Sequence, residues 1–311
     1  MNTIETTFNS RSSATCTLSI NICVTDLPYI NYTVPHLVRS CNYPFTEKML
    51  VIDTAPMKGR YRNRVLPSLS ELEIAAEKLV AQGYIDTIAK VDYCPEVREP
   101  IIKKHLGRAS WETHDFRDAP IYAYLFAYEA AQSDYFLHFD ADMLLHQAEG
   151  FSWIDEAIDC LRQNSEVLTV TPLPGPPDLA LKLKQREIVY TTNPCGFFEF
   201  KEFTARRYLF DRRRLDSLLP IPLSYISWKR QLISQVTRQS AMERWEGMMT
   251  NHLNTSQYIR ADLTASQAWT LHAIDHGTRF LELLPDIITR IEKGDYPPQQ
   301  AGDYDLQLDL W

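Results

Sequence analysis

The stretch DYFLHFDADM, residues 134–143, decides the fold of this chain. The apolar run 135–139 predicts a buried β-strand, and two carboxylates, Asp140 and Asp142, follow it directly. Residues i and i+2 of an extended chain point to the same side, so the two carboxylates can converge on one point. Carboxylates held that close repel each other unless a cation lies between them. The stretch therefore predicts a site for Mg²⁺ or Mn²⁺, which would keep positions open for diphosphate oxygens.

Predicted strands and helices alternate on both sides of this stretch. Strands are expected at 18–24, 48–53, 85–91, 135–139 and 167–171, and helices at 34–40, 68–82, 95–106, 120–132 and 153–162. This alternation predicts the α/β class, with a mostly parallel central sheet flanked by helices on both faces. Such sheets bind ligands beyond the carboxyl ends of their strands. The polar residues that follow these strands are expected on one edge: Thr25, Asp26, Asp53, Asp140 and Asp142.

The order of these features resembles the GT-A glycosyltransferases, especially family 2. Three stretches carry the resemblance, LSINICVTD at 18–26, MLVIDTAP at 49–56 and SDYFLHFDADM at 133–143. The resemblance covers 18–172 and is most specific at the DxD strand. The chain departs from the family pattern at Thr25-Asp26-Leu27-Pro28, and the Arg-Asn pair of the family has its nearest counterpart in Arg117-Asp118.

The resemblance implies a GT-A type nucleotide-diphospho-sugar transferase fold. Residues 18–172 would bind the nucleotide sugar, after a polar leader 1–17, and residues 173–311 would bind the acceptor and close the same compact domain. Thr25 and Asp26 would lie at the nucleoside, Asp53 would bond its base, and Arg117 and Asp118 would contact the nucleotide. Asp140 would reach the ribose and the metal, and Asp142 would be the direct metal ligand. The implied reaction moves a sugar from a nucleotide-diphosphate donor, by default a UDP-sugar, to an acceptor hydroxyl with inversion.

Two acidic residues of the second half are candidates for the general base of that reaction. A base must be an ionised carboxylate within hydrogen-bond reach of the acceptor hydroxyl. Glu243 and Glu246 share a face of a helix expected at 238–253, since they are three residues apart, and Glu243 is the first choice of the two. Asp262 and Asp275 are the next candidates.

Histidines and arginines of the second half offer further ligands. If the stretch WTLHAIDH, residues 269–276, is helical, His272 and His276 share a face at i and i+4, the spacing of two ligands on one metal. Some GT-A families supply a late histidine to the metal, and that resemblance suggests His272 or His276. Two basic clusters, 206–207 and 212–214, offer a guanidinium clamp for a diphosphate. Strands are also expected at 187–192 and 197–200, and helices at 211–218 and 285–293.

Composition limits the partners and the compartment. The net charge of −8 and the pI near 5.5 argue against general nucleic-acid binding. No stretch approaches the roughly 20 apolar residues that span a bilayer, and the leader lacks the pattern of a signal peptide. The six cysteines show no CxxC spacing, which indicates reduced thiols. We therefore expect a cytoplasmic protein with a soluble acceptor.

Other enzyme classes fit the pattern less well. A haloacid-dehalogenase phosphatase places its DxD near the chain start, followed by Thr or Val, whereas Met143-Leu144 follows here. A nucleotidyltransferase usually has a Gly-rich basic loop after the first strand, which Thr25-Asp26-Leu27-Pro28 does not supply. Nucleotidyl transfer on a related fold, and non-catalytic binding of a nucleotide sugar, stay as alternatives.

Overall fold

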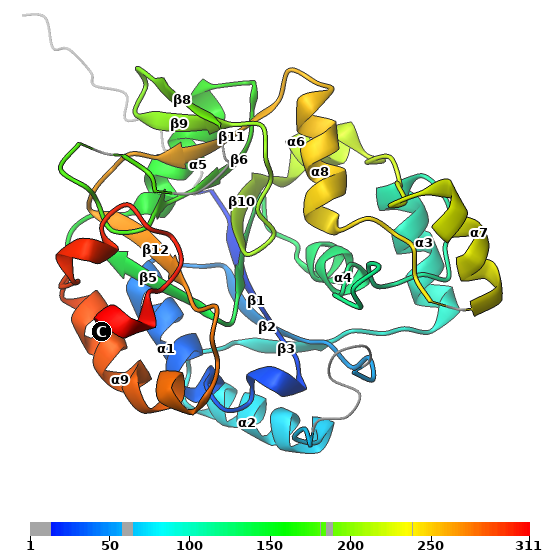
Figure 1. Cartoon of the computed structure of the whole chain (residues 1–311), viewed down its shortest axis with the longest axis horizontal. Helices are drawn as coiled ribbons and strands as arrows, with labels where there is room; N and C mark the ends of the chain where they lie inside the picture. The colour runs from blue at the N-terminus through cyan, green and yellow to red at the C-terminus, as the bar shows by residue number, and fades with distance from the viewer. Residues whose placement is uncertain (1–13, 58–64, 181, 185–188, 238) are drawn as a thin grey trace, which may run out of the picture.

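A nine-stranded sheet forms the centre of the computed structural model, which describes residues 14–57, 65–180, 182–184, 189–237 and 239–311 (Figure 1). Its order is β3-β2-β1-β4-β10-β6-β11-β9-β8. The strands are β1 (Cys16–Ile22), β2 (Glu47–Ile52), β3 (Thr87–Lys90), β4 (Tyr135–Asp140), β6 (Val167–Thr171), β8 (Tyr190–Asn193), β9 (Phe197–Phe200), β10 (Arg207–Asp211) and β11 (Ile259–Leu263). Only β9 and β10 run against the other seven of these strands. The expected α/β fold with a mostly parallel sheet is confirmed.

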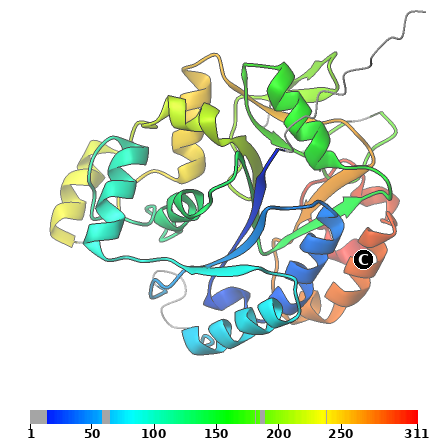
Figure 2. The same ribbon diagram turned by 180° about the vertical axis from the view of Figure 1, so that it is seen from behind.

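Helices cover both faces of the sheet. In β2, Leu50 and Ile52 join one buried apolar cluster, and the alternate residues Met49 and Val51 join another, so both faces are buried. Figures 1 and 2 show one set of helices on each side of strands β1–β3. The first set is α1 (Ile30–Cys41), α2 (Leu69–Ala81) and α9 (Thr278–Glu292), and the second is α3 (Pro95–Leu106), α4 (Tyr122–Ala130) and α8 (Trp245–Asn254). Three further helices are α5 (Trp153–Gln163), α6 (Arg212–Leu218) and α7 (Trp228–Thr237).

A smaller three-stranded sheet lies beside the carboxyl end of β4. It contains β5 (Met143–Gln147), β12 (Ala268–His272) and β7 (Leu173–Pro174), in the order β5-β12-β7. The antiparallel pairing of β12 with β5 places His272 opposite Met143. This small sheet therefore joins the segment after the DxD motif to a segment about 130 residues later in the chain.

A buried histidine ties α1 to β5 and α9. The backbone N–H of Leu145 donates to Nε2 of His36 at 3.1 Å, so the proton of the neutral ring lies on Nδ1 and donates to Glu292 at 3.0 Å. Burial lowers the pKa of His36, which favours this neutral form. The hydrogen bond from His36 and the guanidinium of Arg39 lower the pKa of Glu292 to about 2.

Three expectations for the second half of the chain are wrong in extent or type. The helix expected at 238–253 begins at Trp245, because Met242 pairs with Tyr225 in an extended bridge; residue 238 lies outside the described residues. The helix expected at 285–293 begins at Thr278, since a buried stripe starts at Phe280. Residues 268–272 form a strand instead of a helix, because they pair with β5.

Parts of two other expectations fall on residues that the structure does not describe. The leader 1–17 is described only from residue 14. The strand expected at 187–192 is described only from residue 189, and β8 begins at the next residue, Tyr190. None of the helices in the described part of the chain is long and apolar enough to cross a membrane.

Candidate active site

The DxD motif forms the turn between β4 and β5. Asp140 is the last residue of β4, and its carboxylate accepts hydrogen bonds from the hydroxyl of Tyr124 at 3.0 Å and from Nε2 of His138 at 3.1 Å. His138 is a buried residue of β4 itself, and Tyr124 is a half-buried residue of α4. These two bonds fix the direction in which the carboxylate of Asp140 faces.

Asp142 meets two histidines from the far end of the chain. Nε2 of His272 and Nε2 of His276 each lie 3.5 Å from Oδ2 of Asp142, and Nη1 of Arg206 lies at 4.0 Å. The other carboxylate oxygen of Asp142, Oδ1, is buried and has no hydrogen-bond partner in the described part of the chain. A buried oxygen of a charged group costs free energy unless a donor or a cation satisfies it. The structure thus places both predicted histidines at the predicted DxD aspartate.

The charges of this cluster favour an ionised aspartate. Burial acts to raise the pKa of Asp142, but a hydrogen bond from His276 and the charges of His272 and Arg206 outweigh it and lower the pKa. Burial acts to lower the pKa of His276, whereas its contact with Asp142 raises that pKa, with a net rise. The carboxylate of Asp142 is therefore available as an anionic ligand.

Asp305, near the end of the chain, holds one of the two histidines. The carboxylate of Asp305 accepts from Nδ1 of His272 at 2.9 Å, and the backbone N–H of Leu306 donates to the carbonyl of His272 at 2.8 Å. The bond to Nδ1 leaves Nε2 of His272 as the nitrogen that faces Asp142. A carboxylate behind a histidine in this way is typical of metal ligands.

The donor set suits Mn²⁺ or Mg²⁺ without forming a complete cage. One carboxylate with an unpartnered oxygen and the imidazole of His272 are ligands that manganese accepts, while magnesium favours the oxygens. Nε2 of His276 donates to the carbonyl of Ala273 at 2.9 Å, so this imidazole could bind a metal only after that bond is broken. In the described part of the chain, no group of three or more His, Cys, Asp or Glu side chains is placed so that it could hold a metal ion as the side chains stand. The guanidinium of Arg206 contacts Nε2 of His272, so a positive charge already lies where the imidazole would face a cation. Binding a metal there requires Arg206 to move.

The loop after β1 packs against this cluster. The carboxylate of Asp26 accepts from the backbone N–H of Cys23 at 2.7 Å and from the hydroxyl of Tyr29 at 2.6 Å. The ring of Tyr29 lies 4.9 Å from that of His276, centroid to centroid. Thr25 donates to Asp26 at 3.2 Å, and burial raises the pKa of Asp26. Asp26 is thus bound within its own loop.

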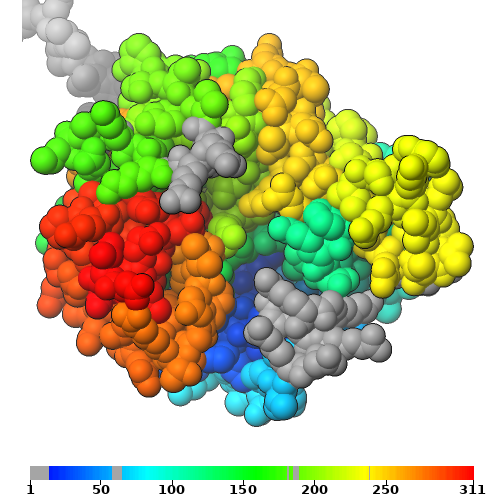
Figure 3. Space-filling view, viewed as in Figure 1, coloured from blue at the N-terminus to red at the C-terminus, as the bar shows by residue number. Residues whose placement is uncertain are grey.

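Two connected cavities open at the carboxyl edge of the sheet. The inner cavity, about 160 Å³, is lined by Asp26, Asp53, Tyr124, Asp140 and Asp142 among others. The outer cavity, about 640 Å³, shares the wall residues Cys23, Pro120, Tyr124 and Asp140 with it. Figure 3 shows the molecule hollowed between the orange C-terminal segment and the green-cyan α4.

Asp53 lies in the wall of the inner cavity. Its Oδ1 accepts from the hydroxyl of Tyr93 at 2.7 Å and from the backbone N–H of Ala55 at 3.0 Å. Both hydrogen bonds are made to Oδ1, so neither of them involves Oδ2 of Asp53. A base with N–H donors is a chemically suitable ligand for that oxygen.

The remaining predicted nucleotide contacts line the outer cavity. Thr25, Arg117 and Asp118 are all in its wall. The guanidinium of Arg117 pairs with Asp115 at 3.2 Å, and Asp118 has φ +63° in the tight turn that follows. Arg206, from the basic cluster 206–207 in the second half of the chain, lines the same cavity.

The two candidate bases differ in position. Glu246, in the first turn of α8, lines the outer cavity, and its Oε1 accepts from the backbone N–H of Ala205 at 3.2 Å. Glu243 precedes the helix, accepts from the backbone N–H of Arg244 at 2.9 Å, and is not among the residues that line this cavity. The reserve candidates Asp262 and Asp275 do not line it either. Asp262 is fully buried against Arg260, and Asp275 accepts from Gly277.

Sequence reasoning missed Asp305, Tyr124 and Tyr29. Asp305 belongs to the pair Asp303-Tyr-Asp305, which repeats the i, i+2 spacing of the DxD motif. That spacing is the sequence feature that could have indicated Asp305 as a site residue. Nothing in the sequence around Tyr124 or Tyr29 distinguishes them from other buried tyrosines.

Comparisons with known proteins give matches among solved structures alone. No family model matches the sequence, and no curated protein matches it. The mannosyltransferase PcManGT from Pyrobaculum calidifontis, in complex with GDP-Man and Mn²⁺, is 12% identical with a TM-score of 0.47, over 88% of this chain and 61% of that one. GalNAc-T7, solved with UDP, GalNAc and Mn²⁺, is 8% identical with a TM-score of 0.47, over 83% and 43%.

A third match is glucosyl-3-phosphoglycerate synthase from Mycobacterium tuberculosis, in complex with Mn²⁺, UDP and phosphoglyceric acid. It is 12% identical with a TM-score of 0.30, over 51% of this chain and 43% of that one. The chain therefore spans 43 to 61% of the length of these three proteins. The matched structures are those of glycosyltransferases, the class that the sequence resembles, and all three TM-scores are below 0.5. At such low identity the likeness assigns no residue, so the function is argued from the side chains of this chain.

Proposed function

We propose that this protein is a metal-dependent glycosyltransferase that moves a sugar from a nucleotide-diphosphate donor to an acceptor hydroxyl. One observation carries the proposal: Asp142, with a buried and unpartnered oxygen, meets His272 and His276 at the edge of the sheet where ligands bind. Asp140, fixed by Tyr124 and His138, completes the predicted metal site. A bound Mn²⁺ or Mg²⁺ would neutralise the charge that develops on the leaving nucleoside diphosphate.

The two cavities suggest how a donor would lie. Asp53 in the inner cavity is suited to the nucleoside, whereas Asp26 in the same wall is already bound within its own loop; UDP is the default because of the family resemblance. Arg206 in the outer cavity carries the charge needed to bind a diphosphate, and Arg117 lies in the same wall. Arg206 contacts both His272 and Asp142, so a diphosphate that attracts its guanidinium would also free the two metal ligands.

Glu246 is our choice for the general base. It lines the outer cavity, whereas Glu243 does not. Its carboxylate would remove the proton of the acceptor hydroxyl while that oxygen attacks the anomeric carbon. Attack from the side opposite the leaving diphosphate gives inversion in a single displacement, as the family 2 resemblance implies.

A thermal-shift panel of nucleoside diphosphates and nucleotide sugars, with and without Mn²⁺, tests the proposal. A ligand at a hundredfold excess over its dissociation constant stabilises the folded state by about 2.7 kcal/mol. We expect such stabilisation in the presence of Mn²⁺ for the unmodified protein and for Asp286→Asn, an exposed control on α9. The Asp142→Asn variant should lose it. Equal stabilisation of Asp142→Asn would overturn the metal site, and turnover of nucleotide without sugar transfer would favour the nucleotidyltransferase alternative.

A further inference from the structure

A third cavity, the arginine cavity, opens beside the outer cavity and has a volume of about 670 Å³. Five of its lining residues are cationic: Lys184, Arg206, Arg207, Arg244 and Arg260. Four are acidic: Glu202, Glu246, Asp303 and Asp305. It shares the wall residues Arg206, Arg244 and Glu246 with the outer cavity, so one ligand can extend between the two.

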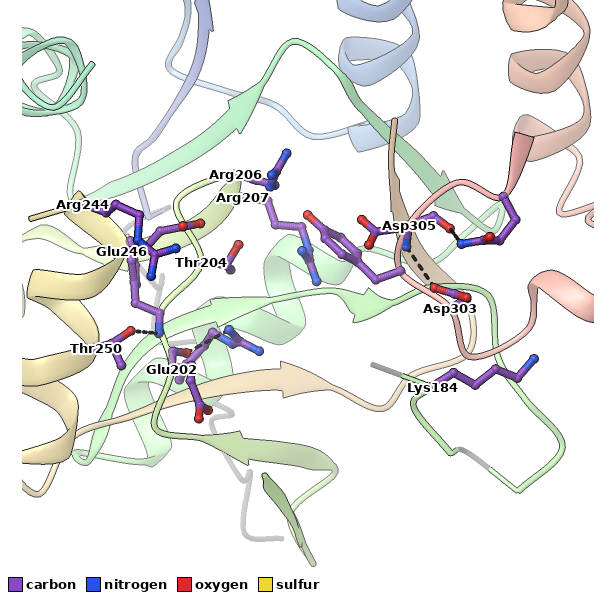
Figure 4. A pocket seen from close by; sticks show the side chains of 14 residues that line it. Lys184, Glu202, Thr204, Arg206, Arg207, Arg244, Glu246, Thr250, Asp303 and Asp305 are labelled. Carbon is purple, nitrogen blue, oxygen red and sulfur yellow. Dashed lines mark hydrogen bonds between the residues drawn. The ribbon is translucent and has the colours of Figure 1, made fainter. Parts of the chain in front are cut away.

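Arg207 is the unusual residue of this cavity. It begins β10 and is only 1% exposed, yet its Nε and Nη2 atoms have no hydrogen-bond partner among the residues that the structure describes. Its guanidinium lies over the ring of Tyr304, 4.2 Å from the centroid. Figure 4 shows the side chain of Arg207 reaching into the middle of the cavity, beyond Thr204. Burial lowers the pKa of Arg207, as expected for a charge removed from water.

The stacking on Tyr304 does not compensate this burial. A desolvated cation–π contact stabilises a guanidinium by less than the burial of an uncompensated charge destabilises it. The same guanidinium has five N–H donors that match an oxyanion in geometry. The unmet hydrogen-bonding capacity of Arg207 therefore favours an anion.

Three acidic residues of the region accept hydrogen bonds from groups other than Arg207. Asp262 is fully buried and forms two bonds to Arg260, at 2.7 and 3.1 Å, while its charge also acts on Arg207 without an ion pair to it. Asp305 accepts from His272, and Glu246 accepts from Ala205. One more acid, Glu202, has a buried Oε2 without a partner, but its side chain points away from Arg207 in Figure 4. Among the described carboxylates, none forms an ion pair with Arg207.

We propose that the arginine cavity binds an oxyanion, a phosphate or a carboxylate, that belongs to the sugar acceptor, with Arg207 as its main anchor. This inference rests on the proposed function, because it takes the outer cavity as the place of sugar transfer. Lys184 at the rim adds a second positive charge. Glu246 lies in the wall between the two cavities, so an acceptor anchored at Arg207 presents its hydroxyl to the proposed base.

Titration of inorganic phosphate, and of acetate in a second arm, tests this inference. Both are followed by calorimetry in saturating UDP and Mg²⁺, which keep the added anion out of the diphosphate site. We expect the unmodified protein to bind one of the two anions, and the stronger arm identifies the acceptor group as phosphate or carboxylate. Arg207→Gln should weaken binding at least tenfold, whereas Arg279→Gln, an exposed arginine on α9, should bind normally.

A second variant covers the case in which Arg207→Gln does not fold. Thr204→Asp leaves Arg207 in place and adds a carboxylate to the cavity wall, so it should weaken anion binding to a similar degree. Binding of neither anion by the unmodified protein, or normal binding by a folded Arg207 or Thr204 variant, would overturn the inference. UDP binding in the same samples separates the two proposals: UDP bound without an anion refutes only the acceptor site. Conversely, anion binding that depends on Arg207, without metal-dependent UDP binding, refutes only the proposed donor site.

Discussion

Replacement of Asp305 by alanine tests how the metal site is built. Asp305 accepts from Nδ1 of His272 at 2.9 Å and so directs Nε2 of that histidine to Asp142. Loss of such a supporting carboxylate lowers metal affinity about 10- to 100-fold, or about 1.4 to 2.7 kcal/mol. The side chain of Asp305 is 43% exposed, and water can replace part of its role. We therefore expect a loss near the lower end, about tenfold.

The assay is a calorimetric titration of Mn²⁺ in the presence of saturating UDP. Asp305→Asn keeps an oxygen that accepts from Nδ1, so its loss of affinity should be smaller than that of Asp305→Ala. Asp309→Asn is the matched control, because this residue lies four positions later and its side chain is 88% exposed. The reasoning is refuted if Asp305→Ala binds Mn²⁺ as tightly as the unmodified protein. A lower melting temperature with unchanged Mn²⁺ affinity would make Asp305 a structural residue only.

Two further predictions concern the base and the acid stability of the fold. Glu246→Gln should lower the rate of sugar transfer about 10²- to 10⁴-fold with unchanged donor affinity, whereas the rate of Glu243→Gln should stay close to normal. Steady-state rates and donor titrations measure the two quantities. A normal rate for Glu246→Gln would exclude Glu246 as the base. Contacts in the folded state lower the pKa of Glu292 from 4.5 to about 2, so its stabilising effect is complete above pH 4.5 and is lost as the pH falls toward 2. The difference in melting temperature between the unmodified protein and Glu292→Gln should therefore shrink from pH 7 to pH 3. For the exposed control Glu282→Gln we expect a constant difference. A constant difference for Glu292→Gln as well would contradict this account.

The first half of the fold could be predicted from the sequence because its signals are local. The apolar run before Asp140 predicts β4, and α3 has the predicted bounds 95–106, with Gly107 in the left-handed region at φ +78°. In the second half, packing overrides such signals. Pro285 was expected to begin a helix, but α9 continues through it because Phe280 and Leu284 pack into the same core as the residues that follow.

The candidate site was predictable only in part, for a physical reason. Two acids after a buried strand indicate a cation site locally, so Asp140 and Asp142 could be chosen from the sequence alone. The sequence predicts the two histidines together on a helical spacing, whereas His272 is the last residue of a strand and His276 lies in the loop after it. They reach Asp142 through the pairing of β12 with β5, which depends on contacts between distant segments and leaves no local pattern.

A crystal structure of the protein with Mn²⁺ and UDP, with the metal located by anomalous scattering, tests the central proposal most directly. We predict one anomalous peak about 2.1 Å from a carboxylate oxygen of Asp142, within reach of His272 or His276, with the nucleoside beside Asp53. Arg206 should have moved away from His272 in that complex. An anomalous peak elsewhere, or none at saturating Mn²⁺ and UDP, would contradict the proposal.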